Sequence, residues 1–445
     1  MNTSSQKPRV CIALPAIQYT PHSPYVRSTL PMVPYLAKDF EITLVYRKIL
    51  NTHVGDHIDH NYLTVVYPNG MSAKEKQNRH PYYNPSDYIT LWKYKEALNQ
   101  FAREHAQDFD LVIEKEWPLL GVLASAFSRY NVPTVILIEA MYKYPKGNYE
   151  QFVLKNLLKQ VASIGFEQVR PYLRGQWSAK TDSIVVETEE MKSVLLDYGY
   201  FPPEKSIYPI PYGVDPEIFA PRERDACRER LGISKDAFVL TYVGSLNRFI
   251  QEPGPIIEAL GREKPQNVVL YLVGDGSKRQ ELEDLAKELE APVVFPGRVP
   301  QKEAALYIGA SNLCIAPYNK HLYLGDKFTC ASLKVPEYLS CARPVLTIPC
   351  ERMETLLDGQ RYGFLVENQV DPYQEFFKNL PSKDELYAME SVIQSDLENG
   401  ILKDKKILLR WWDIAEMYKQ VIEETLAAKR SCRVPVVPNL NVEFV

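Results

Sequence analysis

Long hydrophobic runs and patterned cysteines are both missing from this sequence. No apolar stretch approaches the roughly 18 residues that a membrane-spanning helix needs. The first residues, Met1–Arg9, are polar and are followed only by a short apolar run, Val10–Leu14, so we expect no signal peptide. The seven cysteines are scattered, odd in number and never spaced as CxxC, which is typical of reduced thiols. The sequence therefore predicts a cytoplasmic protein.

A large excess of charge is missing as well. The net charge is −4, so the chain as a whole has no affinity for polyanions and we expect no nucleic-acid partner. Hydrophobic residues make up 45% and charged residues 24%, which is typical of a globular protein. The length of 445 residues exceeds one ordinary hydrophobic core and predicts two domains.

A metal-binding pattern is also missing. His53, His57 and His60 lie close together, but no cysteine or further ligand accompanies them. Because no further ligand accompanies them, we interpret these histidines as part of a solvated loop and expect no metal.

Short apolar runs alternate with helical patterns from end to end, which favours parallel sheets built from βαβ units. The predicted strands of the first half are Val10–Leu14, Ile42–Tyr46, Leu63–Tyr67, Leu111–Ile113, Thr134–Ile138 and Ile184–Val186; those of the second half are Val239–Gly244, Val268–Gly274, Val293–Phe295, Leu313–Ala316 and Val345–Ile348. The predicted fold class is α/β, with two facing doubly wound sheets of the Rossmann type and a cleft between them.

Prolines and a glycine interrupt the pattern at Tyr208–Asp215, which predicts a hinge. We expect an acceptor domain at residues 1–212 and a donor domain at residues 213–405. Residues 406–430 predict a C-terminal helix that packs back on the first domain, and residues 431–445 an irregular tail.

The segment Thr329–Val345 carries the most chemistry. It follows a predicted strand and leads into a helix, and backbone amides at the start of a helix favour phosphate. Ser332 and Lys334 offer a hydroxyl and a cation that suit a diphosphate. Glu337, one turn further on, can accept hydrogen bonds from the two adjacent hydroxyls of a ribose.

This segment resembles the donor-binding signature of the retaining glycosyltransferases of family 4, in which many members read Ser-x-Lys-x-x-Glu-Tyr and then Pro-Val. Further matches follow in the family order: Pro211–Asp215, Tyr242–Leu246, Leu272–Gly276, Gly297–Val299 and Tyr362–Val366. The resemblance covers residues 180–370 well and the N-terminal half only by pattern.

The resemblance implies a GT-B fold and a retaining, metal-independent transfer of a hexosyl group from a nucleotide-diphosphate sugar, UDP- or GDP-linked, with no other cofactor. It implies that the donor is bound by Gly244, Ser245, Arg248, Val299, Thr329, Ser332, Leu333, Lys334 and Glu337. In this scheme Arg248 and Lys334 neutralise the diphosphate leaving group.

The sequence departs from the family pattern at several positions. The first glutamate of the family's E-x7-E pair is replaced by Thr329, which bears on the choice of sugar. The usual arginine is absent from the turn Gly244–Leu246, although Arg248 follows two residues later. Pro336 lies inside the predicted first helical turn, so we expect the helix to start late, with Ser332 and Lys334 in the loop before it.

The N-terminal half lacks the histidine that many family members place after a strand. Glu116 and Glu139 follow two predicted strands instead, where each could orient an acceptor hydroxyl or cap the next helix. The loop after the first strand has no glycine-rich turn, so we assign His22 and Tyr25 to contact with the acceptor.

One basic segment stands apart from the acidic chain. Residues 143–180 hold seven lysines and arginines against two glutamates, a net charge of +5, with an amphipathic pattern in the middle. Such a helix binds anionic membranes, which predicts peripheral contact at an inner membrane surface; the alternative is a helix that buries its apolar face within its own domain.

Three functional hypotheses follow. The first is a retaining glycosyltransferase that acts on a glycan, a lipid-linked or a small-molecule acceptor. The second keeps the fold but changes the chemistry, to a nucleotide-sugar epimerase or a sugar phosphorylase. The third, motivated by Thr329 and the missing histidine, is a degenerate relative that binds a nucleotide sugar or a partner subunit without turnover.

Overall fold

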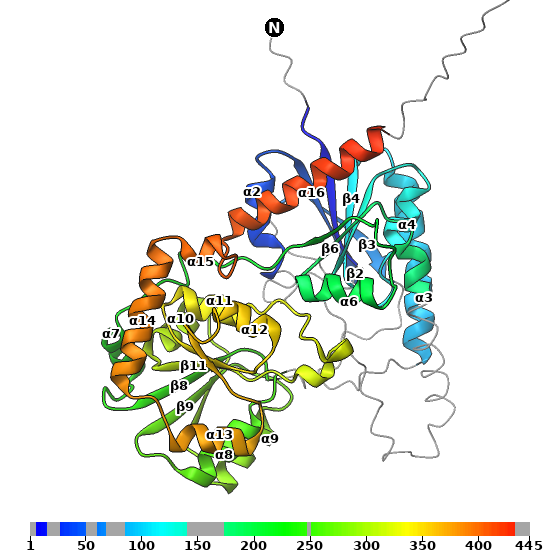
Figure 1. Ribbon diagram of the computed structural model, residues 1–445. Helices are drawn as coiled ribbons and strands as arrows, with labels where there is room; N and C mark the ends of the chain where they lie inside the picture. Colours follow the sequence, from blue (N-terminus) through cyan, green and yellow to red (C-terminus); the bar gives the residue numbers. More distant parts are fainter. Residues whose placement is uncertain are drawn as a thin grey trace, which may run out of the picture.

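The computed structural model describes residues 6–15, 27–49, 60–67, 85–139, 173–246 and 251–431. Its strands form two separate sheets, one in each half of the chain, and all the strand pairs are parallel. Figure 1 shows the two sheets in two lobes, with the chain passing from one lobe to the other and returning at its C-terminal end.

The first sheet has seven strands in the order β3-β2-β1-β4-β5-β6-β7. Its strands are β1 (Arg9–Leu14), β2 (Glu41–Ile49), β3 (Tyr62–Tyr67), β4 (Leu111–Lys115), β5 (Thr134–Ile138), β6 (Ser183–Val186) and β7 (Ile207–Pro209). The strand order reverses between β1 and β4, and a parallel sheet binds ligands at the carboxyl ends of the strands beside such a point.

The second sheet has six strands in the order β10-β9-β8-β11-β12-β13 and repeats this plan. Its strands are β8 (Phe238–Val243), β9 (Val268–Val273), β10 (Val293–Gly297), β11 (Leu313–Ala316), β12 (Val345–Thr347) and β13 (Gly363–Leu365). Here the order reverses between β8 and β11, so a second ligand crevice is expected at their carboxyl ends.

Helices cover both faces of the first sheet. One face packs against α3 (Pro85–His105), α4 (Val122–Ser128) and α6 (Glu189–Asp197), and the other against η1 (Leu30–Met32), α2 (Val33–Leu36) and α16 (Trp411–Ser431). Because both faces are covered, strands such as β4 and β5 are buried at every residue, which explains their unbroken apolar pattern.

The second sheet is also covered on both faces. Apolar side chains of α8 (Gly254–Glu263), α9 (Arg279–Glu288) and α13 (Val370–Lys378) form one cluster with it, and those of α10 (Gln301–Ala310), α11 (Lys334–Ser340) and α12 (Glu351–Leu356) form another. The remaining helices are α7 (Arg224–Leu231), η4 (Lys320–Leu322), η5 (Leu324–Asp326), α14 (Lys383–Glu398) and α15 (Ile401–Asp404).

The predicted fold class is confirmed, and each predicted strand coincides with an observed one to within a few residues. The predicted hinge was partly wrong, because its first residues form β7. This strand is only three residues long and lies at the sheet edge, where Pro209 does not interrupt a central ladder. The irregular tail lies outside the described residues beyond Ser431.

The chain crosses between the lobes at two adjacent segments. The N–H of Val214, on the way out of the first lobe, donates to the carbonyl of Leu409, on the way back (2.9 Å). Helix α16, red in Figure 1, then lies along the first lobe and buries Trp411, Ile414 and Ile422 against it.

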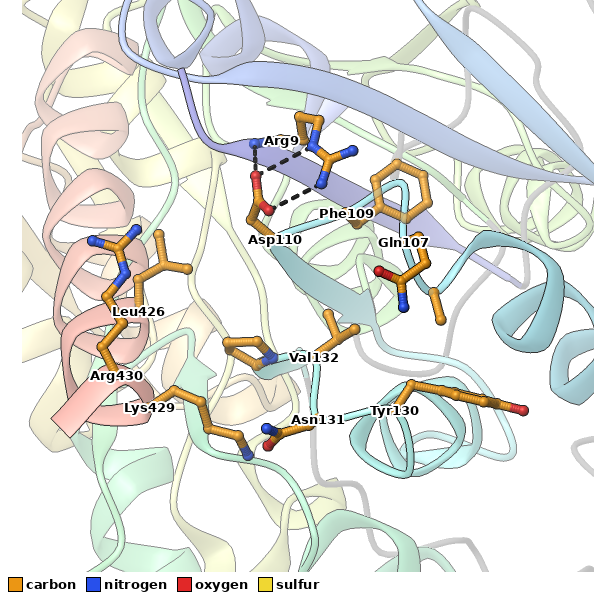
Figure 2. Close-up of a pocket in the computed structure, with 12 residues that line it drawn as sticks. Arg9, Gln107, Phe109, Asp110, Tyr130, Asn131, Val132, Leu426, Lys429 and Arg430 are labelled. Atoms are coloured by element: carbon orange, nitrogen blue, oxygen red, sulfur yellow. Dashed lines mark hydrogen bonds and ion pairs between the residues drawn. The ribbon is translucent and has the colours of Figure 1, made fainter. Parts of the chain in front are cut away.

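A cavity of about 250 Å³ lies at the amino-terminal edge of the first sheet, beside the end of α16. Figure 2 shows the ion pair between Arg9 and Asp110 at its wall (3.1 Å), with Lys429 and Arg430 opposite. Lys429 is itself paired with Asp182 (2.9 Å). The cavity therefore lies at the opposite edge from the ligand crevice that the topology predicts.

No helix in the described part of the chain combines the length and the apolar character needed to cross a membrane.

The packing of α16 predicts that it contributes to the stability of the first domain. Ile422 is fully buried in the cluster that α16 shares with the first sheet, so Ile422→Ala should lower the free energy of unfolding by about 2–5 kcal/mol. Urea unfolding followed by circular dichroism measures this. Gln420→Ala, exposed on the same helix, should change it by less than about 0.5 kcal/mol. Equal losses in the two variants would mean that α16 is not docked as described.

Candidate functional site

The carboxyl ends of the two sheets meet at a loop of the second domain, residues 329–333, which we call the donor loop. From the end of β6 in the first domain, the Thr188 hydroxyl donates to the carbonyl of Thr329 (3.0 Å) and the Glu187 carboxyl accepts the N–H of Ala331 (2.7 Å). The carboxyl edge of the first sheet is therefore in contact with this loop of the second domain.

Ser332 fixes the end of the donor loop. Its hydroxyl oxygen accepts the N–H of Val335 (3.2 Å) and hydrogen-bonds the Tyr318 hydroxyl (2.6 Å). Helix α11 begins at Lys334, so the prediction that placed Lys334 in the loop was wrong. Pro336 fits because the N–H groups of the first helical turn have no partner within the helix.

The Lys334 side chain lies beside two tyrosine rings and a glycine. Its ammonium is 5.5 Å from the ring centre of Tyr242 and 6.0 Å from that of Tyr318, within range of a cation–π attraction. A Cβ at Gly244 would come within 2.9 Å of the Lys334 Nζ. The lysine head thus reaches the carboxyl end of β8, at the point where the strand order reverses.

Two glycines, Gly244 and Gly274, allow two backbone segments to lie close together here. A Cβ at Gly274, which has φ +155°, would come within 1.8 Å of the Gly244 carbonyl oxygen. The ends of β8 and β9 therefore pass each other without side chains, leaving the space that Lys334 fills.

Glu337 is one turn into α11 and only 8% exposed. Burial raises the pKa of its carboxyl to about 7, while Arg27 and Lys334 act in the opposite direction. Arg27, from the first domain, lies 3.8 Å from the carboxylate. Glu337 is thus a buried carboxyl group that basic residues of both domains, Arg27 and Lys334, influence.

Thr329 is fully buried, and within the described part of the chain its hydroxyl has no hydrogen-bond partner. An unsatisfied buried hydroxyl costs about 1–3 kcal/mol, and this one is closed off from solvent.

The two predicted carboxylates of the first domain are both engaged. Glu116 accepts from Arg174 (2.7 Å), and Glu139 pairs with the buried Lys115 (2.7 Å) and accepts from the Tyr212 hydroxyl (3.1 Å). These partners are all side chains, whereas a helix cap would bind backbone N–H groups.

That capping role belongs to Glu114, which the sequence analysis did not single out. Its fully buried carboxyl accepts from Trp117 Nε1 (2.6 Å) and from the N–H of Ala124 in the first turn of α4 (2.8 Å). Burial raises the pKa of Glu114 to about 7.

Several of the predicted site residues are not among those that the structure describes. His22, Tyr25 and Arg248 lie outside the described residues, as do His53, His57 and most of the basic segment. Among the remaining donor residues, Ser245 is exposed, whereas Val299 and Leu333 are half-buried. His60 lies 3.0 Å from the Tyr46 hydroxyl, and no cluster of metal ligands occurs in the part of the chain that the structure describes.

Glu187, Thr188 and Tyr212 are the site residues that sequence reasoning missed. Glu187 directly follows β6, and the rule that selected Glu116 and Glu139 at strand ends applies to it equally.

The second domain matches a known family. Residues 237–380, which include β8 to β13 and α11, match the family model described as "Glycosyl transferases group 1".

Curated relatives share a name that agrees with this match. A D-inositol 3-phosphate glycosyltransferase of Nocardioides sp. is 26% identical over 326 residues, 66% of this chain and 66% of that protein. Another, of Geodermatophilus obscurus, is 25% identical over 289 residues, 62% and 60% of the two chains. A third, of Stackebrandtia nassauensis, is 27% identical over 202 residues, 42% and 43% of the two. The matches thus span about two fifths to two thirds of these relatives.

Solved structures resemble the whole molecule. Sucrose-phosphate synthase from Thermosynechococcus elongatus superposes with a TM-score of 0.66 at 16% identity, covering 95% of this chain and 100% of that one. Anabaena HepE in complex with UDP-glucose gives a TM-score of 0.64 at 14% identity, again with 95% and 100% coverage. Together with the two parallel sheets, these likenesses establish the GT-B fold.

Substitutions at the two glycines should destabilise the protein to different degrees. Gly274→Ala places a Cβ against fixed backbone and should lower the free energy of unfolding by more than about 2 kcal/mol. Gly244→Ala meets the flexible end of Lys334 and the hydroxyl of Tyr242, so it should cost less than Gly274→Ala while displacing the ammonium. Urea unfolding of both variants checks this; equal destabilisation would contradict the geometry at Lys334.

Proposed function

We propose that this protein is a glycosyltransferase that moves a hexosyl group from a nucleotide-diphosphate sugar to an acceptor hydroxyl. The observation that carries the proposal is the placement of Lys334 beside Gly244, with the buried acceptor Glu337 on the same short helix. A cation for the diphosphate and a carboxylate for the ribose are thus one turn apart. The family match of the same domain and the glycosyltransferase names of the relatives support it.

We propose the following roles for the donor residues. Lys334, together with Arg248, neutralises charge on the departing diphosphate, and Glu337 accepts from the ribose hydroxyls. Gly244 and Ser245 allow the backbone to approach the phosphates, and Val299 contacts the base. Ser332 and Leu333 shape the donor loop, and Thr329 faces the sugar.

The transfer is proposed to retain the anomeric configuration and to need no metal, because a lysine and an arginine supply the positive charge that a divalent cation otherwise provides. The donor is proposed to be UDP- or GDP-linked. UDP is favoured, since the similar HepE structure contains UDP-glucose.

The acceptor is proposed to be anionic. Glu116 and Glu139, with His22 and Tyr25, are placed on the acceptor side, and Arg174 accompanies Glu116 there. The basic residues 143–180 favour an acceptor at an anionic membrane surface, whereas the relatives' names point to an inositol phosphate. Both acceptors carry phosphate.

The proposed location is cytoplasmic, the proposed domain limits remain 1–212 and 213–405, and residues 406–430 return to the first domain.

A second candidate function is donor binding without turnover. It is favoured by Thr329, whose hydroxyl replaces a carboxylate in the family's pattern. Slow hydrolysis of the donor in the absence of an acceptor would exclude it.

Substitutions at Glu337 and Thr329 should separate nucleotide binding from sugar binding. Two charge-assisted hydrogen bonds to a ribose are worth about 1.5–3 kcal/mol each, so Glu337→Ala should weaken the binding of UDP by roughly a hundredfold or more. Glu337→Gln, which keeps the shape but not the charge, should fall in between. Isothermal calorimetry with UDP measures both.

Thr329→Ala provides the matched comparison. It should leave the binding of bare UDP nearly unchanged and alter the preference among sugars on that nucleotide. Unchanged UDP binding by a folded Glu337→Ala protein would place the donor elsewhere.

Turnover should also survive the removal of divalent cations. EDTA is expected to change the rate of sugar transfer by less than about twofold, because the leaving group is neutralised by side chains. The measurement is release of UDP from the donor with and without EDTA. Loss of activity that Mn²⁺ or Mg²⁺ restores would disprove this part of the proposal.

A further inference from the structure

Two successive residues of the first domain hold the donor loop by its backbone. Thr188 donates to the Thr329 carbonyl and Glu187 accepts from the Ala331 N–H, so the two bonds grip the loop two residues apart. Both side chains are about 2% exposed, and water does not compete for these bonds. Because Ser332 and Lys334 follow closely in the chain, these two hydrogen bonds determine where the proposed diphosphate site begins.

Glu187 belongs to a buried row of polar groups. The Tyr212 hydroxyl lies within hydrogen-bond distance of both the Glu187 and the Glu139 carboxyls. On its far side, Glu139 is paired with Lys115, whose ammonium also donates to Ser28 and Thr29 (both 2.7 Å). The row therefore runs from Lys115 through Glu139 and Tyr212 to Glu187 and ends at the donor loop.

The hydrogen bonds along this row need one proton more than two ionised carboxylates and a neutral tyrosine can supply. Tyr212 has a single hydroxyl proton, so it can donate to only one of the two carboxyls at a time. If both were ionised, the other contact would join two acceptors. Lys115 neutralises Glu139, and within the described part of the chain no ion pair joins Glu187 to a cation. The additional proton therefore belongs on Glu187, which donates it to Tyr212 while Tyr212 donates to Glu139.

Other elements also bring charged or titratable groups toward Glu187. They are Cys330 of the donor loop, Arg352 of α12, Glu190 of α6 and Tyr418 of α16. Arg352 acts electrostatically on Glu190 more strongly than on Glu187.

We propose that Glu187 is a positioning residue that holds the donor loop in its binding geometry while it carries a proton, and that loss of this proton releases the loop and weakens donor binding. The inference rests on the proposed function, since it concerns the same nucleotide site. Glu187 itself does not touch the donor.

The electrostatics agree with the geometry. Burial, and after it the neighbouring Glu139 carboxylate, raise the pKa of Glu187 to about 8, although hydrogen bonds from Tyr212, Ala331 and Cys330 act in the opposite direction. A carboxyl whose pKa is higher in the clasped state than in an open one favours the clasped state at low pH. This contribution is present at low pH and is lost as the pH rises through about 8.

The expected result is a pH-dependent affinity for UDP. If only the protonated form holds the loop, the Kd of the wild-type protein for UDP, divided by that of Glu187→Gln, should rise roughly tenfold between pH 7 and pH 9. Glu187→Gln stays neutral and can still accept from Ala331, so the two Kd values should agree within about twofold at pH 7. Titration of Glu337, whose pKa is about 7, affects both proteins alike. Calorimetry at both pH values gives these constants, and the ratio between variants cancels the titration of UDP itself.

Three further variants sharpen the test. Glu187→Ala removes the acceptor for Ala331 and should weaken UDP binding at both pH values, which glutamine at the same position avoids. Thr188→Val removes the other bond and should weaken binding while keeping the wild-type pH slope. Glu189→Gln removes an equal charge from an exposed position two residues away and should behave as the wild type. The inference fails if Glu187→Gln keeps the wild-type slope or if Glu187→Ala binds UDP normally.

Unfolding in urea separates this inference from the proposed function. The wild-type midpoint should fall between pH 6 and pH 9 relative to that of Glu187→Gln, because the folded state holds the extra proton. This readout needs no nucleotide. Absence of UDP binding in the wild type would overturn the proposed function, whereas parallel urea midpoints would overturn the role of Glu187.

Discussion

The site depends on two hydrogen bonds, each from a side chain that follows β6 to the backbone of the donor loop. Glu187 and Thr188 directly follow β6 of the first domain, yet they hold Ala331 and Thr329 of the second domain. Lys334 and Glu337 follow within a few residues on α11, and Arg27 approaches Glu337 from the first domain. A change in the relative position of the domains is therefore a change in the donor site itself.

Burial sets the chemistry of the acidic groups around this interface. Glu114 and Glu337 have pKa values raised to about 7 and Glu187 to about 8, in each case mainly by burial. Their partners nevertheless assign them different tasks. Glu114 accepts hydrogen bonds from Trp117 and from a backbone N–H of α4, and so serves the fold. Glu187 accepts from the backbone of the donor loop. Glu337 is influenced by Arg27 and Lys334, the basic residues near it.

The fold was predictable from the sequence because both sheets are covered on both faces, so that each buried strand is a continuous apolar run. The short edge strand β7 was missed because Pro209 and its neighbours resemble a turn, and only pairing with β6 makes them a strand. At the site, Lys334 and Glu337 were identified by a local motif. Glu187 and Tyr212 were not, because what distinguishes them from other strand-end or hinge residues is contact with residues more than a hundred positions away or across the sheet.

The measurement that tests this account most directly is a crystal structure of the protein with UDP bound. The account predicts the diphosphate within hydrogen-bond distance of Lys334 Nζ, beside Gly244, and the ribose hydroxyls on the Glu337 carboxylate. UDP bound without contact to Lys334 or Glu337, for example in the cavity beside Arg9 and Arg430, would contradict it.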